Sequence, residues 1–179
     1  MKLNRPARRA LLVVHVTASA SWLGLTAGLL ALALTATTTG SAVTVEASVR
    51  AMRLFADWIL LPVSLLTLLT GLVLALGTPW GLARHRWVYT KFWLTLATTA
   101  ATAFALRPGL NTAVTAVSGG DPLPGTGDVP AGPVVSLTAY VFMTAISLLK
   151  PWGPTRRGRR LRDADRRRGP RATAGQPAG

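Results

Sequence analysis

The stretch RRALLVVHVTASASWLG, residues 8–24, opens an apolar run that continues to Leu34. A helix needs about 20 mostly apolar residues to cross a hydrocarbon core of roughly 30 Å. Residues 10–34 meet this requirement, and a pair of arginines stands directly before them. The stretch therefore predicts a membrane-spanning helix that contains two unusual residues, His15 and Trp22.

A cleaved signal peptide is the alternative interpretation of this beginning. A basic start, an apolar run and the ASA at residues 18–20 are typical of one. The apolar segment of a signal peptide is only about 7–15 residues long, whereas the apolar character here continues to Leu34. We therefore expect an uncleaved first helix.

Further apolar segments predict a bundle of spanning helices. The predicted spans are residues 10–34, 55–76, 88–106 and 133–149. The Thr/Ser/Gly-rich residues 35–49 and the Pro/Gly-rich residues 108–132 predict loops. Half of the chain is apolar and its charges are gathered in a few places, which is not the pattern of a soluble globule. We expect an all-α protein, with a four-helix transmembrane bundle over residues 1–150.

The distribution of Lys and Arg predicts the orientation of this bundle. Cytoplasmic segments close to membrane ends carry an excess of these residues. With the N-terminus inside, the inner side holds the basic residues of segments 1–9 and 84–91 and of the chain after residue 149. The outer side holds a much smaller set: Arg50, Arg53 and Arg107. We expect both termini in the cytoplasm.

Residues 151–179 form a tail rich in Arg, Pro and Gly. It has too few apolar residues to offset the entropy of ordering, so it predicts a disordered cytoplasmic segment. A basic stretch directly after an inward-running helix favours attraction to anionic lipid over binding of nucleic acid. The expected partners are thus the lipid bilayer as a whole and its anionic lipids at the tail.

Polar residues lie on one face of the first span and on one face of the third. With helical spacing the two sets are His15, Ser19, Trp22 and Thr26, and Lys91, Thr95, Thr98 and Thr102. His15 and Lys91 each lie about 8–9 Å along the helix from the inner basic edge, which predicts similar depths. If these faces meet inside the bundle, they form one polar seam. Ionisable groups in spans usually mark functional sites, although Lys91 can instead snorkel and His15 can make a purely structural hydrogen bond.

Small residues occupy the opposite face of the first span. Ala20, Gly24 and Gly28 form a small-xxx-small series, which allows another helix to approach closely. Such a face fits the inside of the bundle, a second copy of the chain, or a membrane partner.

The second span begins with an ion pair and contains a proline. Arg53 and Asp57 are four residues apart and can pair on one helix face. Pro62 removes a backbone donor and crowds the preceding turn, so it predicts a kink.

Candidate ligands for a metal or cofactor are scarce. The chain has no Cys, and its only histidines are His15 and His85, so no soft-metal cage is predicted. A haem requires less, because one imidazole can hold its iron. Met143 lies near the expected depth of His15 and is a candidate second ligand. No hydrolase elbow, phosphate loop or zincin motif occurs, so no catalytic residue is assigned.

The segments HVTASASWLGLTAGLL, RLFADWILLPVSLLTLLTGLVLALGTPWG and HRWVYTKFWLTL resemble an uncharacterised family of bacterial four-span integral membrane proteins. More distantly, they resemble copper resistance protein D-type membrane domains and HemJ-type protoporphyrinogen oxidases. The resemblance covers about residues 10–108 and implies a bacterial plasma membrane. In the HemJ-like group the first-helix His is associated with haem b and the third-helix Lys with activity. By matching position these are His15 and Lys91.

Two functions follow as expectations. The first is a multi-pass membrane protein that acts as a partner or small transport element. The alternative is a haem-binding membrane redox protein, with His15 as ligand and Lys91 as the charge partner of a propionate or substrate carboxylate. Copper handling is a third expectation, which the scarcity of His and Met weakens.

Overall fold

The computed structural model describes residues 3–77 and 85–149, together with several residues of the tail: Trp152, Gly153, Thr155, Arg156, residues 158–160, Asp163 and Ala164. Over these residues the protein is helical and contains no strand, which confirms the predicted all-α class. The elements are α1 (Arg5–Thr38), α2 (Ala42–Phe55), η1 (Ala56–Leu60), α3 (Leu61–Gly77), α4 (Arg86–Ala101), η2 (Thr102–Leu106), α5 (Arg107–Ser118) and α6 (Ala131–Leu149).

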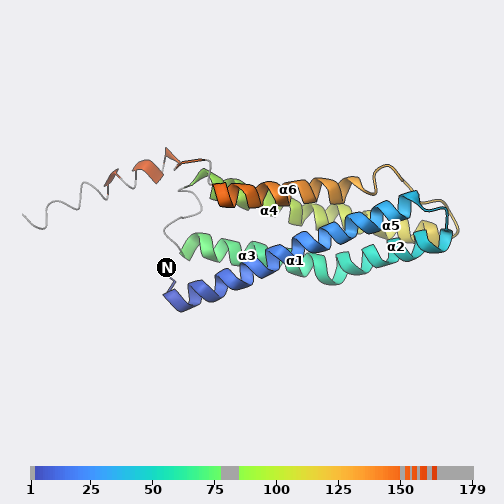
Figure 1. The fold of residues 1–179 in the computed structure, drawn as a ribbon, viewed down its shortest axis with the longest axis horizontal. Coiled ribbons are helices and arrows are strands. Elements are labelled where there is room, and N and C mark those ends of the chain that lie inside the picture. Colours follow the sequence, from blue (N-terminus) through green and yellow to red (C-terminus); the bar gives the residue numbers. More distant parts are fainter. Residues whose placement is uncertain are drawn as a thin grey trace, which may run out of the picture.

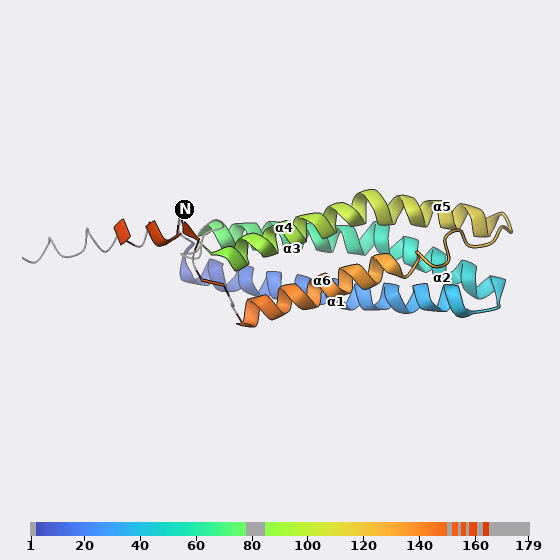
Figure 2. The ribbon, with the colours of Figure 1, turned by 90° about the horizontal axis from the view of Figure 1, so that it is seen from above.

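These elements form an elongated bundle (Figure 1). The segments η1 and η2 are π-helical and join α2 to α3 and α4 to α5. The beginning of α1 and the end of α6 lie at one end of the bundle, and the turns that follow α1 and α5 lie at the other (Figure 1). Helix α1 packs on α2, α3 and α6, while α4 packs on α3 and α6 (Figure 2).

Helix α1 is longer than the predicted first span. Its start is capped by Asn4, whose side-chain oxygen accepts a 2.9 Å hydrogen bond from the Ala7 N–H. The helix contains 34 residues, a length of about 50 Å at 1.5 Å per residue. It therefore extends beyond a hydrocarbon core of roughly 30 Å.

The predicted loop over residues 35–49 is wrong, because α1 and α2 occupy most of it and only residues 39–41 connect them. The threonines at the end of α1 do not interrupt the helix. Thr35 and Thr38 donate their hydroxyls to the carbonyls of Ala31 and Leu34 at 2.9 and 2.7 Å. Such a bond satisfies the hydroxyl within the helix itself.

The predicted loop over residues 108–132 is also too long, since α5 continues to Ser118. Proline at the second position of a helix is tolerated, because an N–H there has no helical partner. Pro108 holds that position in α5, directly after η2, where the Arg107 N–H bonds to the carbonyl of Thr102. Pro62 stands in the same relation to η1. A π-helical segment thus precedes each proline, and the helix continues through Pro62 and Pro108 without a break.

An ion cluster connects the two π-helical segments. Arg107 Nε lies 2.6 Å from Asp57 Oδ1, and Arg53 Nε lies 3.7 Å from Asp57 Oδ2. The predicted pair between Arg53 and Asp57 is therefore confirmed, with Arg107 as a closer partner. Asp57 belongs to η1 and Arg107 follows η2 directly, so the pair holds the two irregular segments together.

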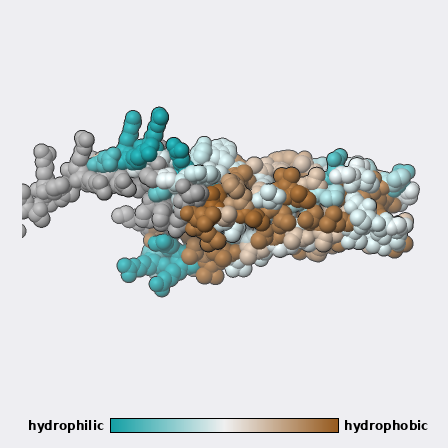
Figure 3. All heavy atoms as spheres, turned by 45° about the horizontal axis from the view of Figure 1, so that its top comes forward, coloured by the Kyte–Doolittle hydropathy of each residue, from teal (hydrophilic) through white to brown (hydrophobic). Residues whose placement is uncertain are grey.

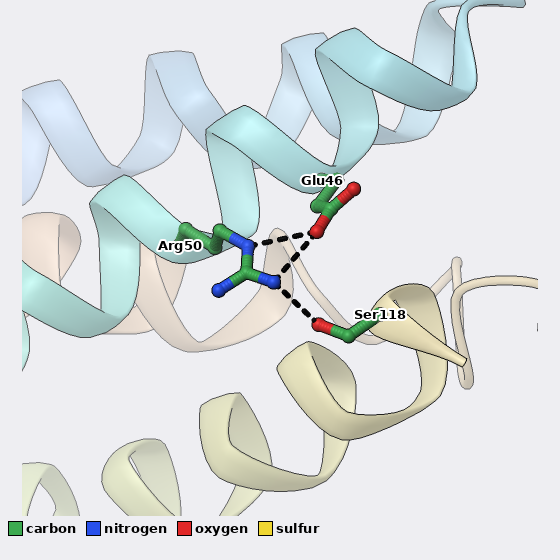
Figure 4. A network of polar contacts seen from close by, with 3 residues as sticks. All are labelled: Glu46, Arg50 and Ser118. Carbon is green, nitrogen blue, oxygen red and sulfur yellow. Dashed lines mark hydrogen bonds and ion pairs between the residues drawn. The ribbon is translucent and has the colours of Figure 1, made fainter. Parts of the chain in front are cut away.

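A second polar network lies toward the far end of the bundle. Arg50 donates from Nε and Nη2 to Glu46 Oε1 at 2.8 and 2.7 Å, and from Nη2 to Ser118 Oγ at 2.8 Å (Figure 4). The network joins α2 to the end of α5. Because the side chains of Arg50 and Glu46 are 55% and 37% exposed, their pair contributes little to stability.

The surface of the bundle is unusually apolar. Large apolar side chains are exposed on it, among them Trp58, Leu76 and Phe104. Figure 3 shows a broad hydrophobic region on one face of the bundle, between more hydrophilic ends. Three helices are long and apolar enough to cross a membrane: Arg5–Thr38, Ala42–Gly77 and Ala131–Leu149. Such a surface suits hydrocarbon better than water.

The small-residue face of α1 does not pack inside the bundle. Ala20, Gly24 and Gly28 are exposed. A Cβ atom added to Gly24 or Gly28 would meet nothing within 4 Å. Most of the predicted disordered tail lies outside the described residues.

Replacing Asp57 with Asn should lower the free energy of unfolding by about 1–2 kcal/mol. The acceptor becomes a neutral amide oxygen and the Arg107 guanidinium loses its countercharge. Thermal unfolding of the detergent-solubilised protein measures the change. Glu46→Gln is the matched control, with an expected loss below about 0.5 kcal/mol because that pair is more exposed. Equal losses in both variants would contradict the stabilising role of the pair.

Candidate functional site

His15 is held against α3 by a hydrogen bond. Its Nδ1 lies 3.0 Å from Thr70 Oγ1. The Thr70 hydroxyl donates its single hydrogen to the carbonyl of Leu66 at 2.7 Å, so its oxygen accepts from the imidazole. This arrangement assigns the proton to Nδ1 and leaves the lone pair on Nε2. A further interaction with the Thr67 backbone also holds the ring against α3, so His15 is an oriented imidazole.

The imidazole fits against α3 because residue 71 is a glycine. A Cβ atom at Gly71 would lie 3.0 Å from His15 Cε1 and 3.5 Å from Nδ1. A side chain at this position would require the imidazole ring to shift by a few tenths of an ångström. Ser19, which the sequence places on the same face as His15, donates to the His15 carbonyl at 2.7 Å instead of reaching a neighbouring helix.

Lys91 reaches from α4 to α6. Its Nζ donates a hydrogen bond to Ser147 Oγ. Ser147 in turn donates to the carbonyl of Met143 at 2.9 Å. The ammonium group therefore has a neutral hydroxyl as partner, and this bond involves no acidic side chain.

His15 and Lys91 line one cavity of about 270 Å³, called here the inner cavity. Arg8 is the third basic residue of its lining, and none of the described lining residues is acidic. Apolar side chains form most of the remaining walls, including those of Leu12, Trp87 and Phe92. A recess with only basic charges and low-dielectric walls concentrates positive potential.

The predicted second ligand does not reach this cavity. Met143 belongs to the buried core, where its sulfur accepts from Thr95 Oγ1 at 3.4 Å. The other histidine, His85, precedes α4 and is not part of the cavity lining. Within residues 3–77, 85–149 and the described tail positions, no group of three or more His, Cys, Asp and Glu could hold a metal ion.

The single polar seam expected from helical spacing is divided in two. Thr95 lines the inner cavity together with His15 and Lys91. Thr26, Thr98 and Thr102 line a different cavity of about 860 Å³, called here the outer cavity. Trp22 lies between His15 and Thr26 on α1, and its buried ring contacts that of Tyr140 in a tilted arrangement with the centroids 4.6 Å apart. This aromatic pair interrupts the expected seam.

Several residues of the two cavities and their contacts were not predicted from the sequence. Thr70, Gly71 and Ser147 contact His15 or Lys91 from helices whose rotation the sequence does not reveal. Tyr140 lines the outer cavity and is a polar residue in an apolar span. A polar residue in a span is a candidate for a functional site, so Tyr140 could have been identified from the sequence.

Adding a methyl group to Gly71 and to Gly24 should have opposite effects on stability. Gly24→Ala should raise the free energy of unfolding by up to about 1 kcal/mol, because the helix gains a better helix former in open space. Gly71→Ala should lower it, because the new Cβ meets His15. Thermal unfolding in detergent measures both. In a His15→Ala background the loss at Gly71 should disappear, and an unchanged loss would show that the imidazole is not its cause.

No protein-family model matches the chain, and no curated protein or solved structure is significantly similar to it. The resemblance of residues 10–108 to membrane protein families therefore stays a prediction, and the function is argued from the cavities.

Proposed function

We propose that the chain is a four-span integral membrane protein of a bacterial plasma membrane, with both termini in the cytoplasm. Three helices long and apolar enough to cross a membrane support this, together with the position of α4 and η2 alongside them (Figure 2). Among the described residues, Arg5, Arg8, Arg9 and Arg86 lie at the starts of α1 and α4, at the bundle end at which α6 ends. That concentration is typical of a cytoplasmic side.

In this proposal the inner cavity binds the acidic end of a lipophilic molecule. The observation that carries it is the meeting of Arg8, His15 and Lys91 on one cavity without an acidic residue. A charged Lys in a span is costly and usually has a countercharge or a functional partner. Because Lys91 bonds to a neutral hydroxyl, its positive charge is available to an anionic ligand. A bound carboxylate would supply the missing countercharge.

The size of the inner cavity decides how much of such a ligand it encloses. Its volume of about 270 Å³ is slightly below the range of roughly 300–1,000 Å³ that is usual for small-molecule sites. It therefore accommodates the acidic end of the molecule, while the apolar remainder lies along the walls and in lipid. A protein of this kind serves as a lipid-binding partner or small transport element.

Haem b is the second candidate, and the geometry of His15 favours it. A metal-ligating His usually donates its other ring N–H to a fixed acceptor, as Nδ1 does here to Thr70. His15 Nε2 would hold the iron, and Arg8 and Lys91 would face the propionates. The bound group would supply one-electron chemistry. Copper handling finds no comparable ligand set among the described residues.

A carboxylate preference of the inner cavity can be measured with dodecanoate and its neutral methyl ester. Dodecanoate should bind at least about tenfold more tightly than the ester, and Lys91→Gln should remove most of that difference, because a desolvated charge pair is lost. Isothermal titration of the detergent-solubilised protein gives both affinities. Arg50→Gln, at the opposite end of the bundle, should leave them unchanged. Equal binding of acid and ester would rule out the anion site.

The haem candidate predicts a coloured protein. Protein purified from haem-replete cells should show a Soret absorption band that disappears in His15→Ala and persists in His85→Ala. The persistence is expected because His85 is not part of the inner cavity lining. A colourless wild-type preparation would exclude haem and leave the lipophilic anion as the ligand.

A further inference from the structure

The outer cavity lies between α6 and the irregular helix made by α4, η2 and α5. Helix α6 packs mainly on α1 and α4, whereas η2 and α5 pack on η1, α2 and α4. The cavity occupies the space between these two groups. Its volume of about 860 Å³ is within the range of small-molecule sites. It has no lining residue in common with the inner cavity.

Small side chains create this space. The wall from α4, η2 and α5 contains Ala97, Ala101, Ala105 and Gly109, spaced four residues apart, and the wall from α6 contains Gly132, Ser136 and Ala139. Larger residues at these positions would fill the cavity. The π-helical segment η2 contributes Thr102, Ala105 and Leu106 to the lining. Irregular segments of this kind often occur at functional sites.

The threonines of the cavity present hydrogen-bond acceptors. Each donates its hydroxyl hydrogen to the carbonyl four residues earlier in its own helix: Thr26 to Trp22 at 2.9 Å, Thr98 to Leu94 at 2.8 Å, Thr102 to Thr98 at 2.9 Å and Thr112 to Pro108 at 3.2 Å. A hydroxyl that has used its hydrogen in this way can still accept through its oxygen. The cavity therefore offers a row of acceptors to a ligand that has a donor.

Tyr140 forms a cluster of hydroxyl groups with other side chains of the cavity lining. The Tyr140 side chain interacts with those of Thr26, Thr98 and Ser136. The only charged residue of the lining is Asp128, an exposed residue that is again an acceptor. None of the described residues that line the cavity is Lys, Arg or His. A carboxylate would therefore find no countercharge, which is unfavourable away from water.

We infer that the outer cavity binds a neutral lipid that carries a hydroxyl group, such as an isoprenoid or other long-chain alcohol. The apolar chain lies along the alanines of α4 and η2, and the hydroxyl donates to a threonine oxygen near Tyr140. This assignment depends on the acceptor row and on the lack of basic residues among the lining residues, not on the anion proposed for the inner cavity.

Farnesol and its methyl ether test the assignment, because the ether retains the chain and loses the donor. Farnesol should bind saturably to the full chain in phosphatidylcholine nanodiscs, and the ether about tenfold more weakly, as expected for the loss of one hydrogen bond. Thr98→Val should reduce the affinity for farnesol to the level of the ether. Thr98→Ser keeps the hydroxyl and should restore it. Lys91→Gln should leave the affinity for farnesol unchanged, which separates this site from the inner cavity.

A space-filling variant tests the location. Ala101→Phe should abolish saturable binding of farnesol, whereas Ala31→Phe, on an exposed part of α1 outside the lining, should not. Both variants are compared as single species in size-exclusion chromatography. Equal affinities for farnesol and its ether would overturn the assignment. So would retained binding in Ala101→Phe, or a change of that variant from dimer to monomer, because the small-residue wall would then be an interface between copies.

Discussion

Pro62 and Pro108 impose the constraint on which the rest of this architecture depends. Each lacks an N–H in a long helix, and in hydrocarbon a freed carbonyl has no water to bond to. In both helices a π-helical segment directly precedes the proline. The two irregular segments lie beside each other and are joined by the ion pair between Asp57 and Arg107. The irregular segment of one helix thus lies beside the irregular segment of its neighbour.

That defect also shapes the interior. Because η2 lies in the middle of its helix, it presents small and polar side chains to the space beside α6. A regular helix packed tightly on α6 would close this space. The π-helical segment that precedes Pro108 therefore also forms part of the wall of the outer cavity. Segments of this kind are frequent at functional sites.

The sequence predicted the helical class, and each predicted span lies within a helical part of the described residues, because apolar runs are strong signals. It failed at residues 35–49 and 108–118, where Thr and Pro predicted loops. Thr35 and Thr38 bond to their own helix, and Pro108 follows a π-helical segment directly, so neither residue type breaks the backbone in these contexts. The composition of a segment does not determine which groups its side chains bond to.

The candidate site was likewise predictable only in part. Counting residues from the basic edge put His15 and Lys91 at similar depth, and they line one cavity. The partners Thr70 and Ser147 were not predictable, because they depend on how α3 and α6 are rotated. The division of the seam was hidden for the same reason. Trp22 shares the polar face of α1, yet its large ring contacts Tyr140 and lies between His15 and the threonines of the outer cavity.

This separation has a chemical consequence for how the two cavities can act. The inner cavity holds basic groups and no acidic residue, while the outer cavity holds acceptors and no basic residue. A carboxylate is favoured in the first and disfavoured in the second, and a neutral donor fits the second. The contact between Trp22 and Tyr140 lies between His15 and Thr26 along α1, and the two cavities have no lining residue in common. If both proposals hold, the bundle binds two chemically different molecules, one in each cavity.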